Sequence, residues 1–244
     1  MPYQVPVVVE FGMITLVVVV TALFVAAAWA SAAPGEGRRD ATRSALGLVA
    51  HLSVSAAAAL SGVLANTSRR PPLFVVLMAF CTAVTVVVAR SRFGARVARL
   101  PLWALVGAQG FRLPLELVLH RAARASVMPV EMSFEGLNFD IITGTTALVL
   151  ALALYSSRVP RLIVLAWSTM GSILLAVIVG VALAASPFMK AFGPVHVNDW
   201  ILYFPYVWLP TVLVQAALFG HIVVFRRLLA EPVARAATGH GGSR

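Results

Sequence analysis

Hydrophobic residues are grouped along the chain in long blocks that are separated by short polar stretches. A transmembrane helix needs about 20 mostly apolar residues, and seven blocks reach or approach that length. In chain order they are residues 11–35, 44–68, 71–89, 101–120, 141–157, 162–186 and 200–225. The pattern predicts an all-α polytopic membrane bundle of seven transmembrane helices. We expect one domain, residues 1–230, followed by a short flexible cytoplasmic tail, residues 231–244.

Two local features refine this outline. After the third block, Arg92, Arg96 and Arg99 recur at helical spacing, which predicts a short basic helix at the membrane interface. In the seventh block, Pro205 and Pro210 each remove a backbone donor, so we expect them to kink that helix.

Composition supports membrane insertion. Hydrophobic residues make up 60% of the chain and charged residues 11%, whereas a soluble domain carries about 25% charged residues. The net charge of +10 is better explained by arginines that flank spans than by binding of nucleic acid, so the expected partner is the lipid bilayer. The single cysteine, Cys81, lies within a span and excludes an intramolecular disulfide.

The basic residues predict the orientation. With the N-terminus outside, five basic residues flank the spans on the outer side, namely Arg69, Arg70, Arg121, Arg124 and Lys190. Thirteen then lie on the cytoplasmic side: Arg38, Arg39, Arg43, Arg90, Arg92, Arg96, Arg99, Arg158, Arg161, Arg226, Arg227, Arg235 and Arg244. Because cytoplasmic loops carry the excess of Lys and Arg, the count predicts an outer N-terminus and a cytoplasmic C-terminus.

Polar side chains interrupt the fourth block and the loop that follows it. Four recur every three or four residues and would form one inward-facing helical stripe: Gln109, Arg112, Glu116 and His120. The loop on the same side of the membrane adds Glu131, Glu135, Asn138 and Asp140. Ionisable groups within a span are costly and are functional candidates by default. We therefore expect these eight residues to form an outward-facing polar site.

Such a site favours a channel or carrier for a small ion, a proton or a polar solute, with loop 131–140 as a gate. The segment 134–140, around a flexible Gly136, could dip back into the membrane as a re-entrant or lid segment. A plain interfacial turn is the alternative, which we slightly favour. Arg112 could also lock helices together through Glu116, Glu10 or a loop carboxylate. The chain would then be a structural or assembly subunit, in a homo-oligomer or with a partner membrane protein.

Two histidines suggest a different class of protein. His51 and His221 are expected at similar depth on different spans, so they could ligate a haem iron from both sides in a membrane redox protein or enzyme. Local hydrogen bonds of each histidine are the simpler interpretation. A zinc site could use His120 with Glu116, completed by His196 or Asp140. No nucleotide-binding or hydrolase motif is present, so catalysis has no positive support in the sequence.

Three segments carry a resemblance: F-R-L-P-L-E-L-V-L-H at 111–120, F-E-G-L-N-F-D-I-I-T-G at 134–144 and Y-F-P-Y-V-W-L-P at 203–210. They resemble parts of a family of bacterial multi-span inner-membrane proteins, with about seven helices, to which no function is attached. The resemblance covers roughly residues 109–225. It implies a location in the bacterial inner membrane and transfers no catalytic or binding residue. The seven spans do not make the chain a microbial rhodopsin, because its single lysine, Lys190, lies in a loop.

Overall fold

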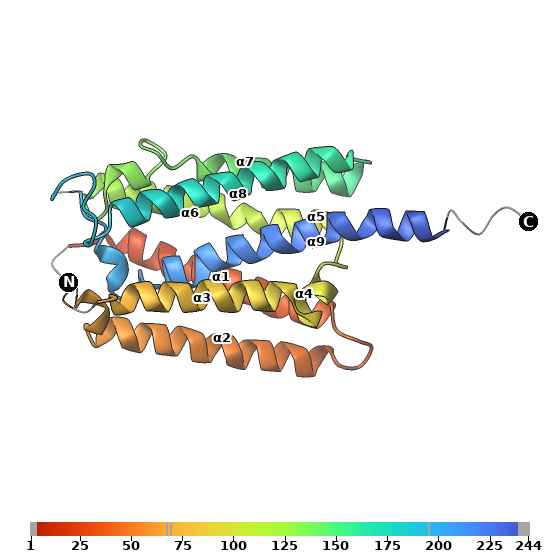
Figure 1. The fold of residues 1–244 in the computed structure, drawn as a ribbon, viewed down its shortest axis with the longest axis horizontal. Coiled ribbons are helices and arrows are strands. Elements are labelled where there is room, and N and C mark those ends of the chain that lie inside the picture. The colour runs from red at the N-terminus through yellow and green to blue at the C-terminus, as the bar shows by residue number, and fades with distance from the viewer. Residues whose placement is uncertain (1–3, 67, 69, 195, 239–244) are drawn as a thin grey trace, which may run out of the picture.

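The computed structural model describes residues 4–66, 68, 70–194 and 196–238, with side chains up to residue 230. Every regular element in this part of the chain is helical, which confirms the all-α prediction (Figure 1). The helices are α1 (Val7–Ala30), α2 (Gly37–Leu60), α3 (Leu73–Arg90), α4 (Arg92–Val97), α5 (Leu102–Gly107), α6 (Arg112–Arg124), α7 (Asp140–Ser156), α8 (Arg161–Ala184) and α9 (Val214–Thr238). A 3-10 turn, Ala108–Phe111, joins α5 to α6, and a π-helical turn, Leu209–Leu213, leads into α9.

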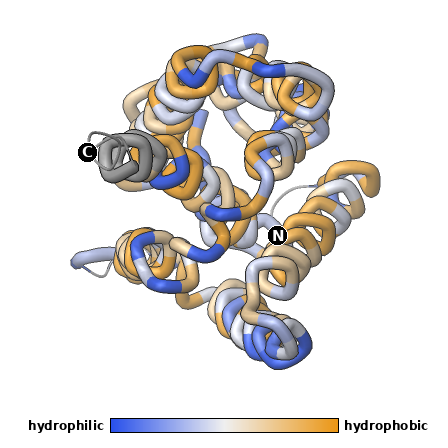
Figure 2. The backbone as a smooth tube through the Cα atoms, turned by 90° about the vertical axis from the view of Figure 1, so that its right-hand side faces the viewer, coloured by the Kyte–Doolittle hydropathy of each residue, from blue (hydrophilic) through white to orange (hydrophobic). Residues whose placement is uncertain are grey.

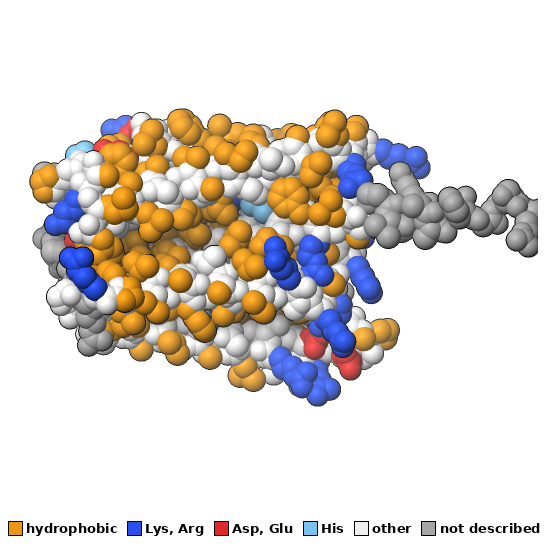
Figure 3. Space-filling view, viewed as in Figure 1, with side chains coloured by type: hydrophobic (Ala, Val, Ile, Leu, Met, Phe, Trp, Pro, Cys, Tyr) orange, Lys and Arg blue, Asp and Glu red, His pale blue; other side chains and the backbone are white. Residues whose placement is uncertain are grey.

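Six helical stretches are long and apolar enough to cross a membrane. They are Val7–Ala30, Gly37–Leu60, Leu73–Arg90, Leu102–Arg124, Arg161–Ala184 and Leu209–Ala230. Hydrophobic residues dominate the helices in the end-on view of Figure 2 and the middle of the face shown in Figure 3. A soluble protein would bury such side chains, so these are features of a multi-pass membrane protein. α7, the counterpart of the fifth predicted span, is apolar but has only 17 residues.

Basic side chains gather at one end of the bundle, on the right in Figure 3. The turns between α1 and α2, between α3 and α5, and between α7 and α8 share this end, and the described ends of the chain lie at opposite ends (Figure 1). Here Arg96 of α4 donates to Asp40 of α2 at 2.5 Å, and Arg226 donates to the carbonyl of Ser91 at 3.0 Å. Among the predicted flanking residues, Arg69, Arg244 and the side chain of Arg235 lie outside what the structure describes.

The last helix differs from its prediction. It begins with the π-helical turn at Leu209, nine residues after the predicted start. The reason is Pro205, because a proline disfavours the α conformation of the residue before it, here Phe204. Pro210 lies in the first turn, where a missing N–H costs little, and does not kink the middle of the helix. At the other end, α9 continues to Thr238, so most of the expected flexible tail is helical.

The segment before this helix is part of the core. Trp200 and Tyr206 are each 1% exposed and pack with their ring centroids 4.7 Å apart. Trp208 donates from Nε1 to the carbonyl of Leu52 in α2 at 3.2 Å. Burial, with a smaller contribution from the charge of Glu10, raises the pKa of Tyr206 to about 12. The phenol therefore stays protonated at physiological pH and serves as a packed neutral group.

Candidate functional site

Arg112 is the centre of the polar interior. Its side chain is 1% exposed and forms a bidentate ion pair with Asp140 at the start of α7. Nε donates to Oδ2 at 2.6 Å, and Nη2 donates to Oδ1. Nη1 contacts His221 Nε2 at 2.8 Å, and Nη2 approaches the carbonyl of Gly171 at 3.5 Å. The guanidinium thus connects α6 with α7, α8 and α9, and four of its five N–H groups are directed at partners.

The contacts of His221 define where its proton lies. A guanidinium can only donate, so His221 Nε2 must accept from Arg112. The ring then carries its proton on Nδ1, which donates to the hydroxyl oxygen of Ser168 at 3.1 Å. Both ring nitrogens are used, and the ring is 2% exposed. His221 therefore relays the hydrogen bonding of Arg112 to the middle of α8.

Glu116 lies next to this centre but has different partners. It is 1% exposed, and both carboxylate oxygens accept from Asn138 Nδ2, at 2.9 and 2.8 Å. Asn138 Oδ1 accepts in turn from the backbone N–H of Asp140 at 3.1 Å. Among the described residues, no cationic group lies within ion-pair distance of Glu116. Asn138 thus connects the carboxyl group of Glu116 to the backbone of Asp140, and of these two buried carboxyl groups only that of Asp140 is paired with the Arg112 guanidinium.

Asp140 reaches Arg112 because loop 125–139 folds down into the bundle. The stretch α5–α6 packs antiparallel to α7. A Cβ at Gly144 of α7 would meet the backbone of Leu113 in α6, and the rings of Trp103 in α5 and Tyr155 in α7 have their centroids 5.6 Å apart. This register places Asp140 about six residues, roughly 9 Å, below the end of α6 at Arg124. The loop fills that space with buried side chains that include Met132, Ser133 and Asn138. The loop is therefore packed into this end of the bundle.

Gly136 permits this compact loop by close packing. A Cβ at this position would lie 2.4 Å from the carbonyl oxygen of Val130 and 2.5 Å from the Cα of Glu131. The N–H of Leu137 donates to the carbonyl of Glu131, and the N–H of Gly136 to that of Ser133, both at 2.9 Å. The glycine therefore allows two backbone segments to touch.

The remaining predicted site residues of the loop end lie nearer to the surface. His120 stacks on Phe134 with ring centroids 4.4 Å apart, and its Nδ1 is 3.9 Å from Glu135. Glu135 also accepts from the exposed Arg124 at 3.0 Å. Polar groups therefore continue from Glu116 towards this end of the bundle, through His120 one turn further along α6.

Two predicted residues lie apart from the Arg112 centre. Glu131 pairs with His196 Nδ1 at 2.7 Å in the loop region. Gln109 is 2% exposed, and its Nε2 lies so close to α9 that a Cβ at Gly220 would clash with it. Of the eight predicted residues, the structure brings Arg112, Glu116, Asn138 and Asp140 into one buried network, and places His120 and Glu135 on the path from that network to the surface.

The two histidines proposed as haem ligands are not brought together. His51 Nε2 bonds to the carbonyl of Thr211 at 3.0 Å, ten residues before His221 on the same helical stretch, which is about 15 Å along its axis. His221 already uses both nitrogens towards Arg112 and Ser168. The described residues also contain no group of three or more His, Cys, Asp or Glu side chains that could hold a metal ion. The geometry therefore supports neither the haem pair nor the zinc set.

Apolar side chains flank the centre along two of its helices. In α8, Trp167 of one apolar cluster and Leu175 of the other flank Gly171, whose carbonyl faces Arg112. In α9, Ala217 and Val223 flank His221 in the same way. The Arg112 centre is thus a buried polar core with apolar side chains before and after it along α8 and α9. Comparison with known proteins finds no matching family, no matching curated protein and no matching solved structure.

Proposed function

We propose that the chain is a membrane carrier that moves a proton, or a small cation in its place, through the polar core between α6, α7, α8 and α9. The observation that carries the proposal is Glu116, which is buried with the neutral Asn138 as its only direct polar contact among the described residues. An ionised carboxylate without a cation is costly in an apolar interior. A bound proton or cation removes that cost, so Glu116 is suited to take up and release one.

The rest of the network supports this role. Arg112 and Asp140 neutralise each other, so the charge of the core changes with the occupancy of Glu116. His120 and Glu135 provide titratable groups between Glu116 and the surface of the loop end. The apolar layer towards the basic end closes the other side. A buried site of this kind fits a carrier that opens alternately better than an open channel.

The proposal includes a location and an orientation. We place the chain in a bacterial inner membrane with seven spans, counting the short α7 together with the six longer helical stretches. An odd number of spans agrees with the described ends of the chain, which lie at opposite ends of the bundle. The basic end then faces the cytoplasm by the positive-inside rule. A green fluorescent protein fused after Arg244 is therefore expected to fluoresce in cells, while alkaline phosphatase fused there is inactive. The opposite pair of results would contradict this orientation.

Glu116→Gln tests the transport function directly. The amide keeps the side-chain length and an acceptor for Asn138, but it cannot exchange a proton at physiological pH. We expect proteoliposomes with the wild-type chain to dissipate an imposed pH or cation gradient, measured with a trapped fluorescent indicator. With Glu116→Gln the rate is expected to fall to that of protein-free liposomes.

The matched control is Glu36→Gln, the same change at an exposed position in the turn before α2, which is expected to keep the wild-type rate. Each variant is first shown to be monodisperse and folded by circular dichroism. Wild-type flux in a folded Glu116→Gln variant, or no wild-type flux above liposomes alone, would leave the centre with a purely structural role in holding four helices together.

A further inference from the structure

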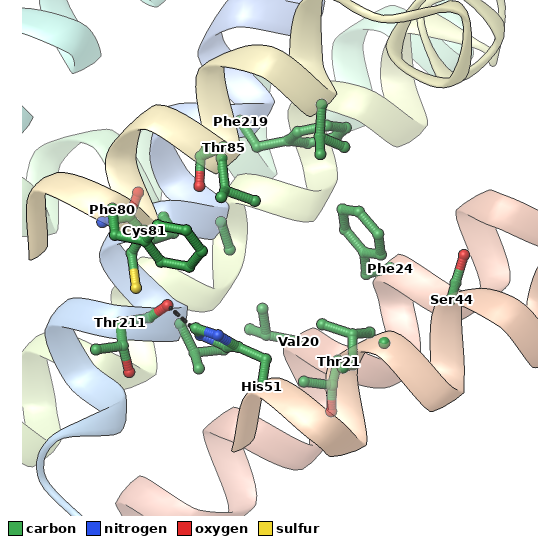
Figure 4. A pocket seen from close by; sticks show the side chains of 17 residues that line it. Val20, Thr21, Phe24, Ser44, His51, Phe80, Cys81, Thr85, Thr211 and Phe219 are labelled. Carbon is green, nitrogen blue, oxygen red and sulfur yellow. Dashed lines mark hydrogen bonds between the residues drawn. The ribbon is translucent and has the colours of Figure 1, made fainter. Parts of the chain in front are cut away.

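A cavity separate from the Arg112 centre lies between α1, α2, α3 and the start of α9 (Figure 4). Its volume is about 350 Å³, within the range of small-molecule sites. Most of its lining is apolar, with Val20, Phe24, Phe80 and Phe219 among the contributing side chains. It lies on a different side of α9 from His221, which turns towards α6 and α8. What this cavity binds can therefore be inferred independently of the proposed carrier activity.

The cavity opens towards the region that lipid would occupy. α2 packs mainly on α1 and α3 packs on α9, while α2 and α3 make little contact with each other. Gly47 of α2 and Phe80 and Val84 of α3 line the cavity and are exposed on the outside of the bundle. A molecule dissolved in the bilayer could thus enter sideways between these two helices.

An unused acceptor marks the inner wall of this cavity. Gln215 is 6% exposed, and its Nε2 donates to the carbonyl of Pro210 at 3.1 Å, within the π-helical turn. Its Oε1 is buried and has no hydrogen-bond partner among the described residues. Buried polar atoms are nearly always paired, so an unpaired one in a cavity wall points to a partner from outside the chain. π-helical turns are also frequent at functional sites.

His51 adds a second acceptor to the same cavity. Its Nε2 bonds to the carbonyl oxygen of Thr211 at 3.0 Å (Figure 4). Since a carbonyl can only accept, Nε2 must carry the proton, and in the neutral ring Nδ1 is an acceptor. The hydroxyls of Ser44 and Thr85, which also line the cavity, can serve as donor or acceptor. Gln215 Oε1 and His51 Nδ1 can only accept, so a ligand that engages either of them must bring a donor.

We infer that this cavity binds a membrane-dissolved lipophilic alcohol, whose chain lies against the apolar wall and whose hydroxyl donates to Gln215 Oε1 or His51 Nδ1. The apolar lining and the opening between α2 and α3 select a molecule that partitions into the bilayer. The two acceptors select one that carries an O–H group over an otherwise equal ether or hydrocarbon.

Binding of tritiated farnesol to the full chain in nanodiscs tests the inference, with farnesyl methyl ether as the probe that keeps the chain and lacks the donor. We expect the wild type to bind farnesol about tenfold more tightly than the ether, because the ether leaves a buried acceptor unpaired. In Gln215→Leu this preference should fall to about twofold or less. Equal binding of both probes to the wild type, or a preference unchanged in Gln215→Leu, would overturn the assignment.

Gly47→Phe tests the location. A Cβ at Gly47 meets nothing within 4 Å, so the larger side chain can extend into the mouth of the cavity without displacing the protein. Farnesol binding is expected to weaken at least about tenfold. The matched control is Gly180→Phe on the exposed face of α8, where a Cβ also meets nothing within 4 Å, and it should bind as the wild type does. If both variants bind farnesol as the wild type does, the inferred site is wrong.

Discussion

Arg112→Met is expected to lower the free energy of unfolding by about 3–5 kcal/mol, the largest effect of any single substitution proposed for this chain. The reason is that Asp140 would remain buried without its bidentate partner, and an uncompensated buried charge is far more costly than the lost attraction alone. His221 Nε2 would lose its donor as well. The measurement is unfolding in mixed micelles titrated with SDS, followed by circular dichroism.

The double variant Arg112→Met/Asp140→Leu separates the ion pair from the rest. Replacing a buried pair by apolar side chains of similar size is often nearly neutral, so we expect the double variant to recover most of the loss. A remainder of about 1–3 kcal/mol would come from the unpaired His221 nitrogen. Arg124→Met is the control, since Arg124 is 67% exposed. Additive losses in the double variant would mean that the two side chains do not stabilise each other.

Gly144→Ala is expected to destabilise the protein by about 1–3 kcal/mol through overpacking between α6 and α7. The new Cβ would lie 2.3 Å from the backbone nitrogen of Leu113 and 2.9 Å from the carbonyl carbon of Arg112. These are backbone atoms, so no side-chain rotation can relieve the contact, and the two helices must separate next to the ion pair. SDS-titrated unfolding measures the loss.

Gly180→Ala provides the comparison for this glycine. It makes the same substitution on α8, where a Cβ has no neighbour within 4 Å, and the unfolding free energy should change by less than about 1 kcal/mol. If Gly144→Ala and Gly180→Ala behave alike, the close approach of α6 to α7 does not limit stability.

The positions of the helices were largely predictable because hydrophobic length is a strong signal. Each predicted block has a helix at its place, and six of the helical stretches satisfy the length and hydropathy of a span. The prediction failed where backbone chemistry overrides hydropathy. The segment after Trp200 is as apolar as a span, yet Pro205 interrupts it and the helix starts at Leu209. By contrast, the block predicted at 141–157 matches α7, Asp140–Ser156, within one residue at each end.

The sequence predicted which polar residues of α6 are buried, but it did not predict which hydrogen-bond partner each of them has. The spacing of Arg112 and Glu116 indicated a buried stripe, and both side chains are buried. The sequence left Glu116, Glu10 and a loop carboxylate open as the partner of Arg112. The structure pairs it with the loop carboxylate Asp140 and with His221, while Glu116 turns to Asn138. Partners more than 100 residues apart, such as Arg112 and His221, depend on how the helices pack, which a single sequence does not encode locally. A histidine within the apolar stretch 216–225 of the last helix was the available signal.

The depth of Asp140 also has a consequence for how the chain is made. During synthesis, the stretch Leu102–Arg124 emerges with an unpaired guanidinium near its middle, and placing such a group at the centre of a span costs about 2.5–3.5 kcal/mol. The compensating carboxylate of Asp140 follows 28 residues later, at the start of a short helix. The charge of Arg112 in α6 is balanced only when Asp140 of α7 is packed against it. The α6–loop–α7 hairpin is therefore the smallest continuous piece of this chain that contains Arg112 together with its ion-pair partner.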